Sequence, residues 1–138
     1  MTTVIAAIVA AAVVATLAGW WSTRRSGSVR EVRSQPAPGS DTADLGLSHT
    51  GPTVVHFSAP WCGPCERVRR VVGEVCHDLG DVAHVEVDLD ANPATARRFS
   101  VLSLPTTLIF DVEGRQRYRA SGVPKAADLR SALEPLLA

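Results

Sequence analysis

The sequence predicts an α/β domain in which a central mixed sheet of four to five strands is flanked by helices, preceded by one N-terminal hydrophobic helix. Short β-branched runs alternate with segments whose apolar residues recur at helical spacing, which favours this class. An uncharged apolar run stands before them, separated by a polar segment that contains proline and glycine. The chain has 138 residues, 46% of them hydrophobic, which suits one globular domain and excludes a disordered chain.

Composition excludes two further classes of protein. The 14 basic and 14 acidic side chains balance, whereas a nucleic-acid-binding protein normally carries a basic excess. The three cysteines are too few for a fold that depends on several disulfides. We therefore expect no nucleic-acid partner, and the local motifs must indicate the function.

The N-terminal run from Val4 to Trp21 contains no charged residue. At about 1.5 Å per residue it reaches about 27 Å as a helix, which is enough to cross the hydrocarbon core of a bilayer. Trp20 and Trp21 close the run, where aromatic rings prefer the membrane interface. We interpret residues 1–23 as a transmembrane anchor, with a cleaved signal peptide as the alternative.

The charges around this run favour an anchor and predict its orientation. A signal peptide begins with a basic region, but residues 1–3 are Met-Thr-Thr. The basic residues follow the run instead, at Arg24, Arg25, Arg30 and Arg33. The positive-inside rule then predicts a single-pass membrane protein with its C-terminal domain on the cytoplasmic side. An extracytoplasmic domain is the alternative.

Residues 24–45 are rich in Ser, Arg, Gly, Pro, Ala and Asp, and they offer little from which to build a core. We interpret them as a flexible linker and residues 46–138 as the folded domain. Within the linker, a short edge strand over Val29–Val32 is the alternative.

The first half of the domain predicts a strand, a helix and a second strand. Thr53–Phe57 is a short β-branched run, which is typical of a buried strand. Cys65–Leu79 has apolar residues at positions 68, 71, 72, 75 and 79, which is the spacing of one helix face. Val82–Val87 is again short and rich in valine, which favours a strand.

The second half predicts a helix, a hairpin of two strands and a final helix. Asn92 and Pro93 are favoured residues for a helix start. Gly114 suits the turn of the hairpin, and the arginines of its second strand favour an edge or an exposed face. Pro135 should distort the last turn of the final helix. The expected elements are Asn92–Ser100, Thr106–Phe110, Gln116–Ser121 and Lys125–Leu137.

The pentapeptide Trp61-Cys62-Gly63-Pro64-Cys65 lies between the first strand and the first helix of the domain. Two cysteines at this spacing can close a small disulfide ring. At a helix start, the unpaired N–H groups and the helix dipole stabilise the thiolate of Cys62 and lower its pKa. Cys62 is therefore the candidate nucleophile, and Cys65, one turn into the helix, would resolve the mixed disulfide.

Two metal-related interpretations of this motif are disfavoured. A structural zinc site needs four ligands, and the nearby candidates Cys76 and His77 lie in the same predicted helix. A c-type haem needs histidine directly after the second cysteine, where this chain has Glu66. We therefore expect no metal and no organic cofactor beyond the redox-active Cys62–Cys65 pair.

Four motifs, WCGPC, N-P-x-T-A, F-x-V-x-S-L-P-T and F-x-x-x-G, resemble the thioredoxin family over about residues 50–138. The resemblance implies a thioredoxin-like fold in which Cys62 attacks and Cys65 resolves. It implies that Pro105 follows a cis peptide bond and faces the dithiol. It also implies a groove in which an extended substrate chain pairs with backbone groups, formed by Trp61, Gly63, Pro64, Leu104, Pro105 and the Ser121-Gly122-Val123 loop.

The sequence departs from the family beneath the dithiol. His56 stands where the family has a buried aspartate, and Glu86 stands in place of its partner lysine. We hypothesise that Glu86 orients the imidazole and that His56 accepts the proton of Cys65, since histidine titrates near neutral pH. The alternative is that His56 is only a satisfied polar group. Cys76 is expected to be a small buried hydrophobe, and no role is assigned to His49, His77 or His84.

Together these observations predict a thiol–disulfide oxidoreductase that reduces protein disulfides through a mixed-disulfide intermediate. Its partners would be protein disulfide substrates, the membrane, and an upstream dithiol reductase or membrane electron donor. One alternative is an extracytoplasmic reductase or isomerase for exported or cytochrome-maturation proteins. Another is a non-catalytic adaptor that uses the groove only to bind proteins.

Overall fold

The computed structural model describes residues 2–36 and 42–138, in which five strands form one mixed sheet in the order β1-β5-β4-β2-β3. Strands β2 and β3 run parallel, and the other neighbouring strands run antiparallel. This sheet confirms the predicted α/β class with its mixed strand order. The strands are β1 (Arg30–Pro36), β2 (Thr53–Ser58), β3 (Ala83–Asp88), β4 (Thr106–Phe110) and β5 (Arg115–Ser121).

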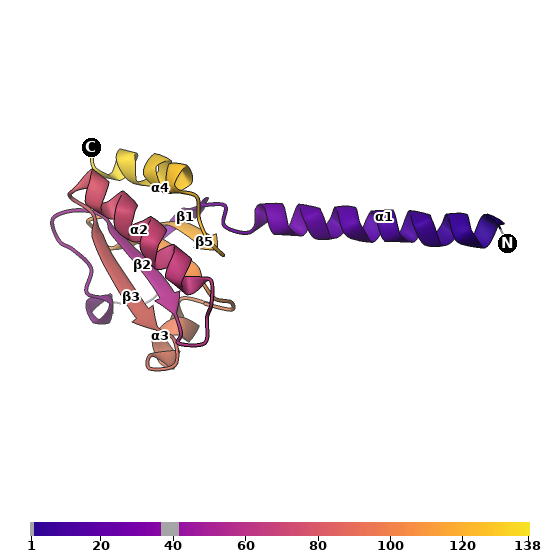
Figure 1. The fold of residues 1–138 in the computed structure, drawn as a ribbon. Coiled ribbons are helices and arrows are strands. Elements are labelled where there is room, and N and C mark those ends of the chain that lie inside the picture. The colour runs from indigo at the N-terminus through magenta and orange to yellow at the C-terminus, as the bar shows by residue number, and fades with distance from the viewer. Residues whose placement is uncertain (1, 37–41) are drawn as a thin grey trace.

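Helices cover both faces of the sheet (Figure 1). On one face, α2 and α4 pack against Val54 and Ile109, while on the other face Phe99, next to α3, packs against Phe57 and Phe110. The α-helix α4 ends at Leu133 and a single 3₁₀ turn follows, as the proline at position 135 predicts. The helices are α1 (Thr2–Arg25), α2 (Cys65–Leu79), α3 (Pro93–Arg98) and α4 (Ala126–Leu133).

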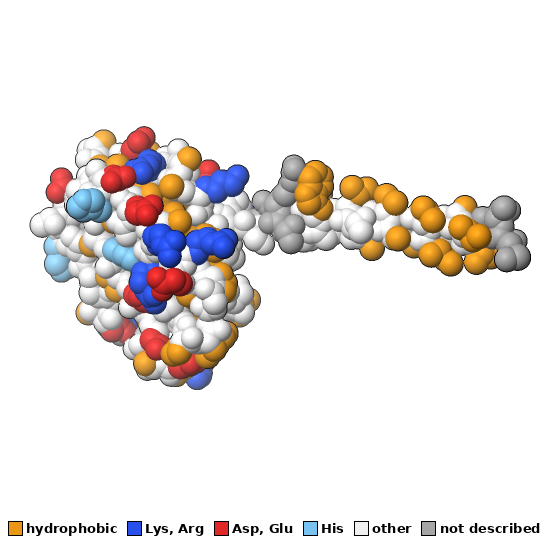
Figure 2. All heavy atoms as spheres, viewed as in Figure 1, with side chains coloured by type: hydrophobic (Ala, Val, Ile, Leu, Met, Phe, Trp, Pro, Cys, Tyr) orange, Lys and Arg blue, Asp and Glu red, His pale blue; other side chains and the backbone are white. Residues whose placement is uncertain are grey.

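Helix α1 extends away from the sheet, and hydrophobic side chains stand along its length (Figures 1 and 2). From Val4 to Ser22 it is long and apolar enough to cross a membrane, and none of that stretch is buried against the rest of the protein. The predicted N-terminal hydrophobic helix is therefore present, and it continues as far as Arg25.

The interpretation of residues 24–45 as a flexible linker is wrong where β1 forms. This strand pairs antiparallel with β5, so of the two expectations for β5, an edge or an exposed face, the edge position is wrong. The edge of β5 supplies backbone donors and acceptors, and pairing with them needs no apolar side chains, so a polar strand leaves little trace in a hydrophobic pattern. Leu45 is also buried, which places the start of the domain before residue 46. An edge strand forms here, as the alternative predicts, but it spans Arg30–Pro36 instead of Val29–Val32. Residues 37–41 of the predicted linker lie outside the described residues.

Candidate active site

The two cysteines of the motif lie where β2 gives way to α2. Their sulfur atoms are bonded at 2.04 Å. Cys62 lies in the turn and is partly accessible, whereas Cys65 begins α2 and is only 2% exposed. Cys62 therefore lies near the positive end of the helix dipole, where a thiolate is stabilised. The accessible and buried positions match the roles of attacking and resolving thiols.

Two loops that are far apart in the sequence meet to form part of the expected groove. The Leu104–Pro105 peptide bond is cis, as the resemblance predicts. Gly122 N donates to Pro105 O at 2.9 Å, and its φ of +85° is one that glycine adopts without strain. Leu104, half-buried, belongs to the same pair of loops.

The remaining groove residues surround Cys62. Gly63 and Pro64 are exposed, and Trp61 is 68% exposed. The indole of Trp61 donates from Nε1 to Asp90 Oδ2 at 3.0 Å, which ties it to the loop after β3. The ring thus offers an apolar face to solvent beside the dithiol.

His56 is fully buried in β2, and its nearest polar partner is a histidine to which the sequence assigned no role. His56 Nδ1 lies 2.9 Å from His84 Nε2. His56 Nε2 faces Glu86 Oε1 at 3.5 Å but forms no hydrogen bond. His84 therefore fixes the imidazole, and Glu86 acts on it only as a nearby negative charge.

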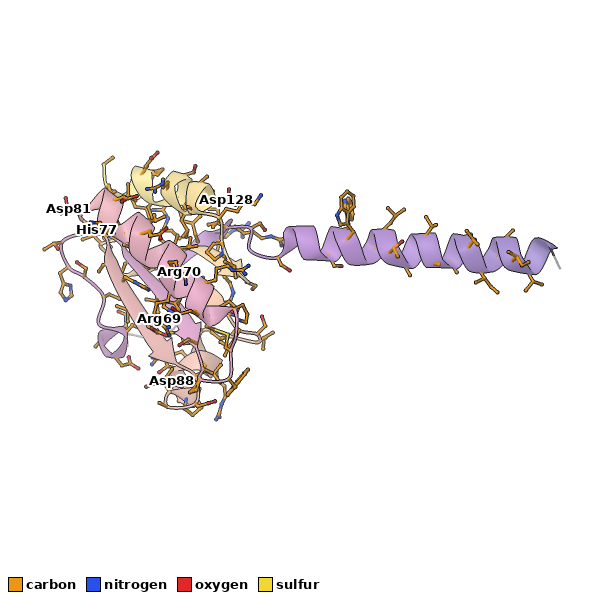
Figure 3. The ribbon with its side chains drawn as sticks, viewed as in Figure 1. Arg69, Arg70, His77, Asp81, Asp88 and Asp128 are labelled. Carbon is orange, nitrogen blue, oxygen red and sulfur yellow. A yellow bond between two sulfur atoms is a disulfide. The ribbon has the colours of Figure 1, made fainter. Side chains whose placement is uncertain are left out.

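Glu86 is instead held by α2 and by the end of β2. Arg69 donates to its carboxylate from Nε at 2.9 Å and from Nη2 at 2.6 Å, and Ser58 Oγ donates to it at 2.7 Å. The hydrogen bond with Arg69 is the main reason that the pKa of Glu86 falls to about 2. Arg69 lies one helical turn after Cys65, so this network is joined to α2 near the end of the helix that carries the dithiol; Figure 3 labels Arg69 on this helix.

Burial lowers the pKa of His56 to about 4, and the neighbouring His84 reinforces this shift while Glu86 opposes it. Burial also lowers the pKa of His84. At pH 7 His56 is therefore neutral, so one of its ring nitrogens can accept a proton. A cleft of about 390 Å³ lined by Ser58, Arg69 and Glu86 opens beside this network.

The contact between His84 and His56 has a signal in the sequence, the alternation of residues along β3. Alternate residues of a strand share a face, so His84 and Glu86 point the same way from β3. In the parallel register Glu86 lies opposite His56, which brings His84 to the same side as well. The pattern His-x-Glu beside a buried histidine therefore predicts a cluster once the register is known.

The other cysteine and histidines lie apart from this site. Cys76 is 6% exposed, and burial raises the pKa of its thiol to about 11, as expected for a buried hydrophobe. His49 and His77 are exposed. Among residues 2–36 and 42–138, no three His, Cys, Asp or Glu side chains gather in a metal-binding arrangement.

Comparison with known proteins shows where the chain belongs. The family model "Thioredoxin" matches residues 43–135. A thioredoxin of Mycolicibacterium smegmatis is 45% identical over 94 residues, which cover 65% of this chain and 83% of that protein. A thioredoxin of Mycobacterium tuberculosis is 42% identical over 86 residues, covering 61% and 73% respectively.

Solved structures agree with the sequence comparison. The X-ray structure of Fasciola hepatica thioredoxin matches with a TM-score of 0.56 and 30% identity, covering 63% of this chain and 82% of that one. Mitochondrial thioredoxin 3 of Saccharomyces cerevisiae, in its oxidised form, matches with a TM-score of 0.55 and 26% identity, covering 62% and 78%. Membership of this family implies protein disulfides as substrates and a reductase as electron donor. With its Cys62–Cys65 pair in the active-site position, this chain belongs to the thioredoxin family and is a thiol–disulfide oxidoreductase.

Proposed function

We propose that this chain is a membrane-tethered enzyme that reduces protein disulfides on the cytoplasmic side. The observation that carries the proposal is the joining of an exposed apolar helix, Val4–Ser22, to a domain with a Cys62–Cys65 couple. The Gly63-Pro64 pair between the cysteines resembles that of the reducing members of the family. No metal or organic cofactor is needed, because the dithiol itself carries the two electrons.

The reaction proceeds by two thiol–disulfide exchanges. The Cys62 thiolate attacks one sulfur of the substrate disulfide, forms a mixed disulfide and releases the first substrate thiol after proton uptake. Cys65 then loses its proton and attacks Cys62 Sγ, which releases the second thiol and leaves the Cys62–Cys65 disulfide. An upstream dithiol reductase or a membrane electron donor returns both electrons.

His56 is proposed to accept the proton of Cys65 in the second exchange. Support comes from the geometry of the ring, because its Nε2 has no hydrogen-bond partner and the carboxylate of Glu86 lies 3.5 Å from it. The pKa of about 4 counts against the role, because burial makes the neutral ring a weak base. The positive charge that forms on the ring faces the carboxylate of Glu86 at 3.5 Å, and His84 holds the other ring nitrogen at 2.9 Å. His84 and Glu86 are thus positioning residues.

The variant His56→Ala tests this role. We expect turnover at pH 7 to fall by about tenfold, which is below the full effect of a general base because the neighbouring cleft admits water. The mixed disulfide should accumulate, since only the second exchange is slowed. His77→Ala, an exposed histidine on α2, is the matched control. A loss of less than about twofold in the His56 variant would exclude the role.

The reducing direction is tested by the reduction potential of the full-length chain in detergent, equilibrated against glutathione or dithiothreitol. A potential near about −270 mV matches a reductant, and one of about −200 mV or higher favours an extracytoplasmic oxidant or isomerase. Replacing both Cys62 and Cys65 with serine tests the adaptor alternative. The adaptor alternative would be favoured if the wild type showed protein binding but no reductase activity, and if the double variant bound proteins equally well.

The tether and its orientation need their own experiment. A reporter fused after Ala138 should be active only in the cytoplasm, and the protein should remain in the membrane fraction with its N-terminus intact. Activity of the reporter outside the cytoplasm would favour the extracytoplasmic alternative. Loss of residues before about Trp20 would instead identify a cleaved signal peptide.

A further inference from the structure

The segment between α1 and β1 is held against one loop of the substrate groove. Gly27 N donates to Ser121 O at 2.5 Å. A Cβ at Gly27 would lie 2.1 Å from Val123 O, and its φ is +89°, so only glycine fits this approach. A Cβ on Gly122 would lie 3.2 Å from Gly27 N, so the contact is close from both sides. The chain leaving α1 is therefore in backbone contact with the loop after β5 (Figure 1).

A cleft of about 690 Å³ opens between this segment and the groove. One side carries Ser26, Arg30 and Glu31, and the other side carries Leu104, Ser121 and Gly122. Its volume lies in the range of sites that hold ligands, which is about 300–1,000 Å³. None of its lining residues belongs to 61–65, so the cleft lies beside the attack site rather than over it.

The side of the cleft that β1 contributes is polar and charged. Arg30 and Glu31 are exposed. Arg119, which also lines the cleft, is held in place because its guanidinium donates to Phe99 O at 2.7 Å and to Ser100 O at 2.6 Å. Such a surface suits a polar polypeptide chain better than an apolar ligand.

We propose that residues 26–32 form an outer wall of the substrate cleft and select the polypeptide segment that flanks the attacked disulfide. This inference rests on the disulfide-reductase function proposed above. An extended chain bound at Leu104 passes through the cleft between that loop and residues 28–32, beside the point where Gly27 contacts Ser121, while its cysteine lies at Cys62 outside the cleft. A small disulfide reaches Cys62 without entering the cleft, so the wall discriminates between the two classes of substrate.

Filling the cleft tests the proposal with the full-length chain in detergent. In Ser26→Trp the indole occupies the passage, so KM for insulin should rise by about tenfold. The rate with a small aromatic disulfide, dithiobis-nitrobenzoate, should stay within about twofold, because that reagent needs only Cys62. Ser131→Trp, at an exposed serine on α4, is the matched control and should change neither.

An unchanged KM for insulin in Ser26→Trp would contradict the proposal that residues 26–32 select the substrate. An equal loss of activity with insulin and with the small disulfide would contradict it as well. If the wild type reduces neither substrate, the proposed reductase function itself fails, which is a separate result.

Reversing one charge of the wall gives a milder test that leaves the backbone alone. Glu31→Lys should raise the ratio of kcat/KM for a disulfide peptide with acidic flanks to that for one with basic flanks by about threefold. Glu74→Lys, at an exposed glutamate on α2, should leave the ratio unchanged. Equal ratios in wild type and Glu31→Lys would contradict the proposal even if Ser26→Trp failed to fold.

Discussion

Strand β2 presents two faces whose residues are all buried but do different work. Phe57 and Val55 pack on one face in an apolar cluster with Leu108 and Phe110. His56, between them in sequence, points to the opposite face toward α2 and has His84 and Glu86 as neighbours. Adjacent positions of one strand thus face an apolar cluster on one side and a polar network on the other.

The comparison of the two faces of β2 shows that the polar face lowers the stability of the fold. A buried polar atom without a hydrogen bond destabilises a protein, and His56 Nε2 is such an atom. An apolar residue at this position would remove that cost. The role proposed above for His56 would account for a polar residue at this position.

The largest expected effect is on stability, from a substitution in the apolar cluster. In Phe57→Ala the free energy of unfolding should fall by about 3–5 kcal/mol, because a fully buried ring is lost and a cavity remains. Below the unfolding temperature, the reduction potential and the reactivity of Cys62 should be unchanged. Urea unfolding and insulin reduction measure the two quantities, with Phe57→Leu as a milder control. A potential that shifts along with stability would show that the two faces are not separable.

The second prediction concerns the polar face and pH. The pKa of His56 is about 4 in the folded protein against 6.5 ordinarily, so between these values the unfolded chain binds a proton that the folded chain does not. Stability from this group is complete above pH 6.5 and is lost as the pH falls to 4, by about 3 kcal/mol in all.

The measurement is urea unfolding of the full chain in detergent between pH 7 and pH 4. His56→Gln cannot titrate, so its stability should lose about 3 kcal/mol less than that of the wild type over this range. Parallel curves for the two proteins would refute the prediction. Glu86 also contributes near pH 4, because its pKa is about 2 in the folded protein against 4.5 ordinarily, but both proteins carry this carboxylate, so its contribution cancels in the comparison.

The sequence predicted what depends on short-range pattern. The spacing of Val68, Val72 and Val75 predicted α2 and its buried face, and the motif around Cys62 predicted the redox pair. These signals are local, because periodicity and chemical spacing lie within one element.

The features that were missed depend on register and on long-range pairing. Strand β1 is held by backbone hydrogen bonds to β5, and the polar side chains of β1 give no hydrophobic pattern from which this pairing could be predicted. The contact between His84 and His56 follows from the parallel register of β2 and β3. Likewise, nothing in a lone Ser26-Gly27 pair indicates that it meets the loop at Gly122.

The smallest expected effect concerns Cys76, which lies on the same side of the sheet as His56 but belongs to the apolar cluster there. Cys76 packs in the same cluster as Val54 and Val72, and the raised pKa of its thiol keeps it protonated at neutral pH. Cys76→Ala should therefore cost about 1 kcal/mol of unfolding free energy, as for removal of one buried group, and leave turnover and peroxide sensitivity unchanged. Urea unfolding and insulin reduction, each with and without peroxide, check this. If the variant instead changed the response of the enzyme to peroxide, Cys76 would take part in the redox chemistry. The redox site would then extend along α2 as far as Cys76.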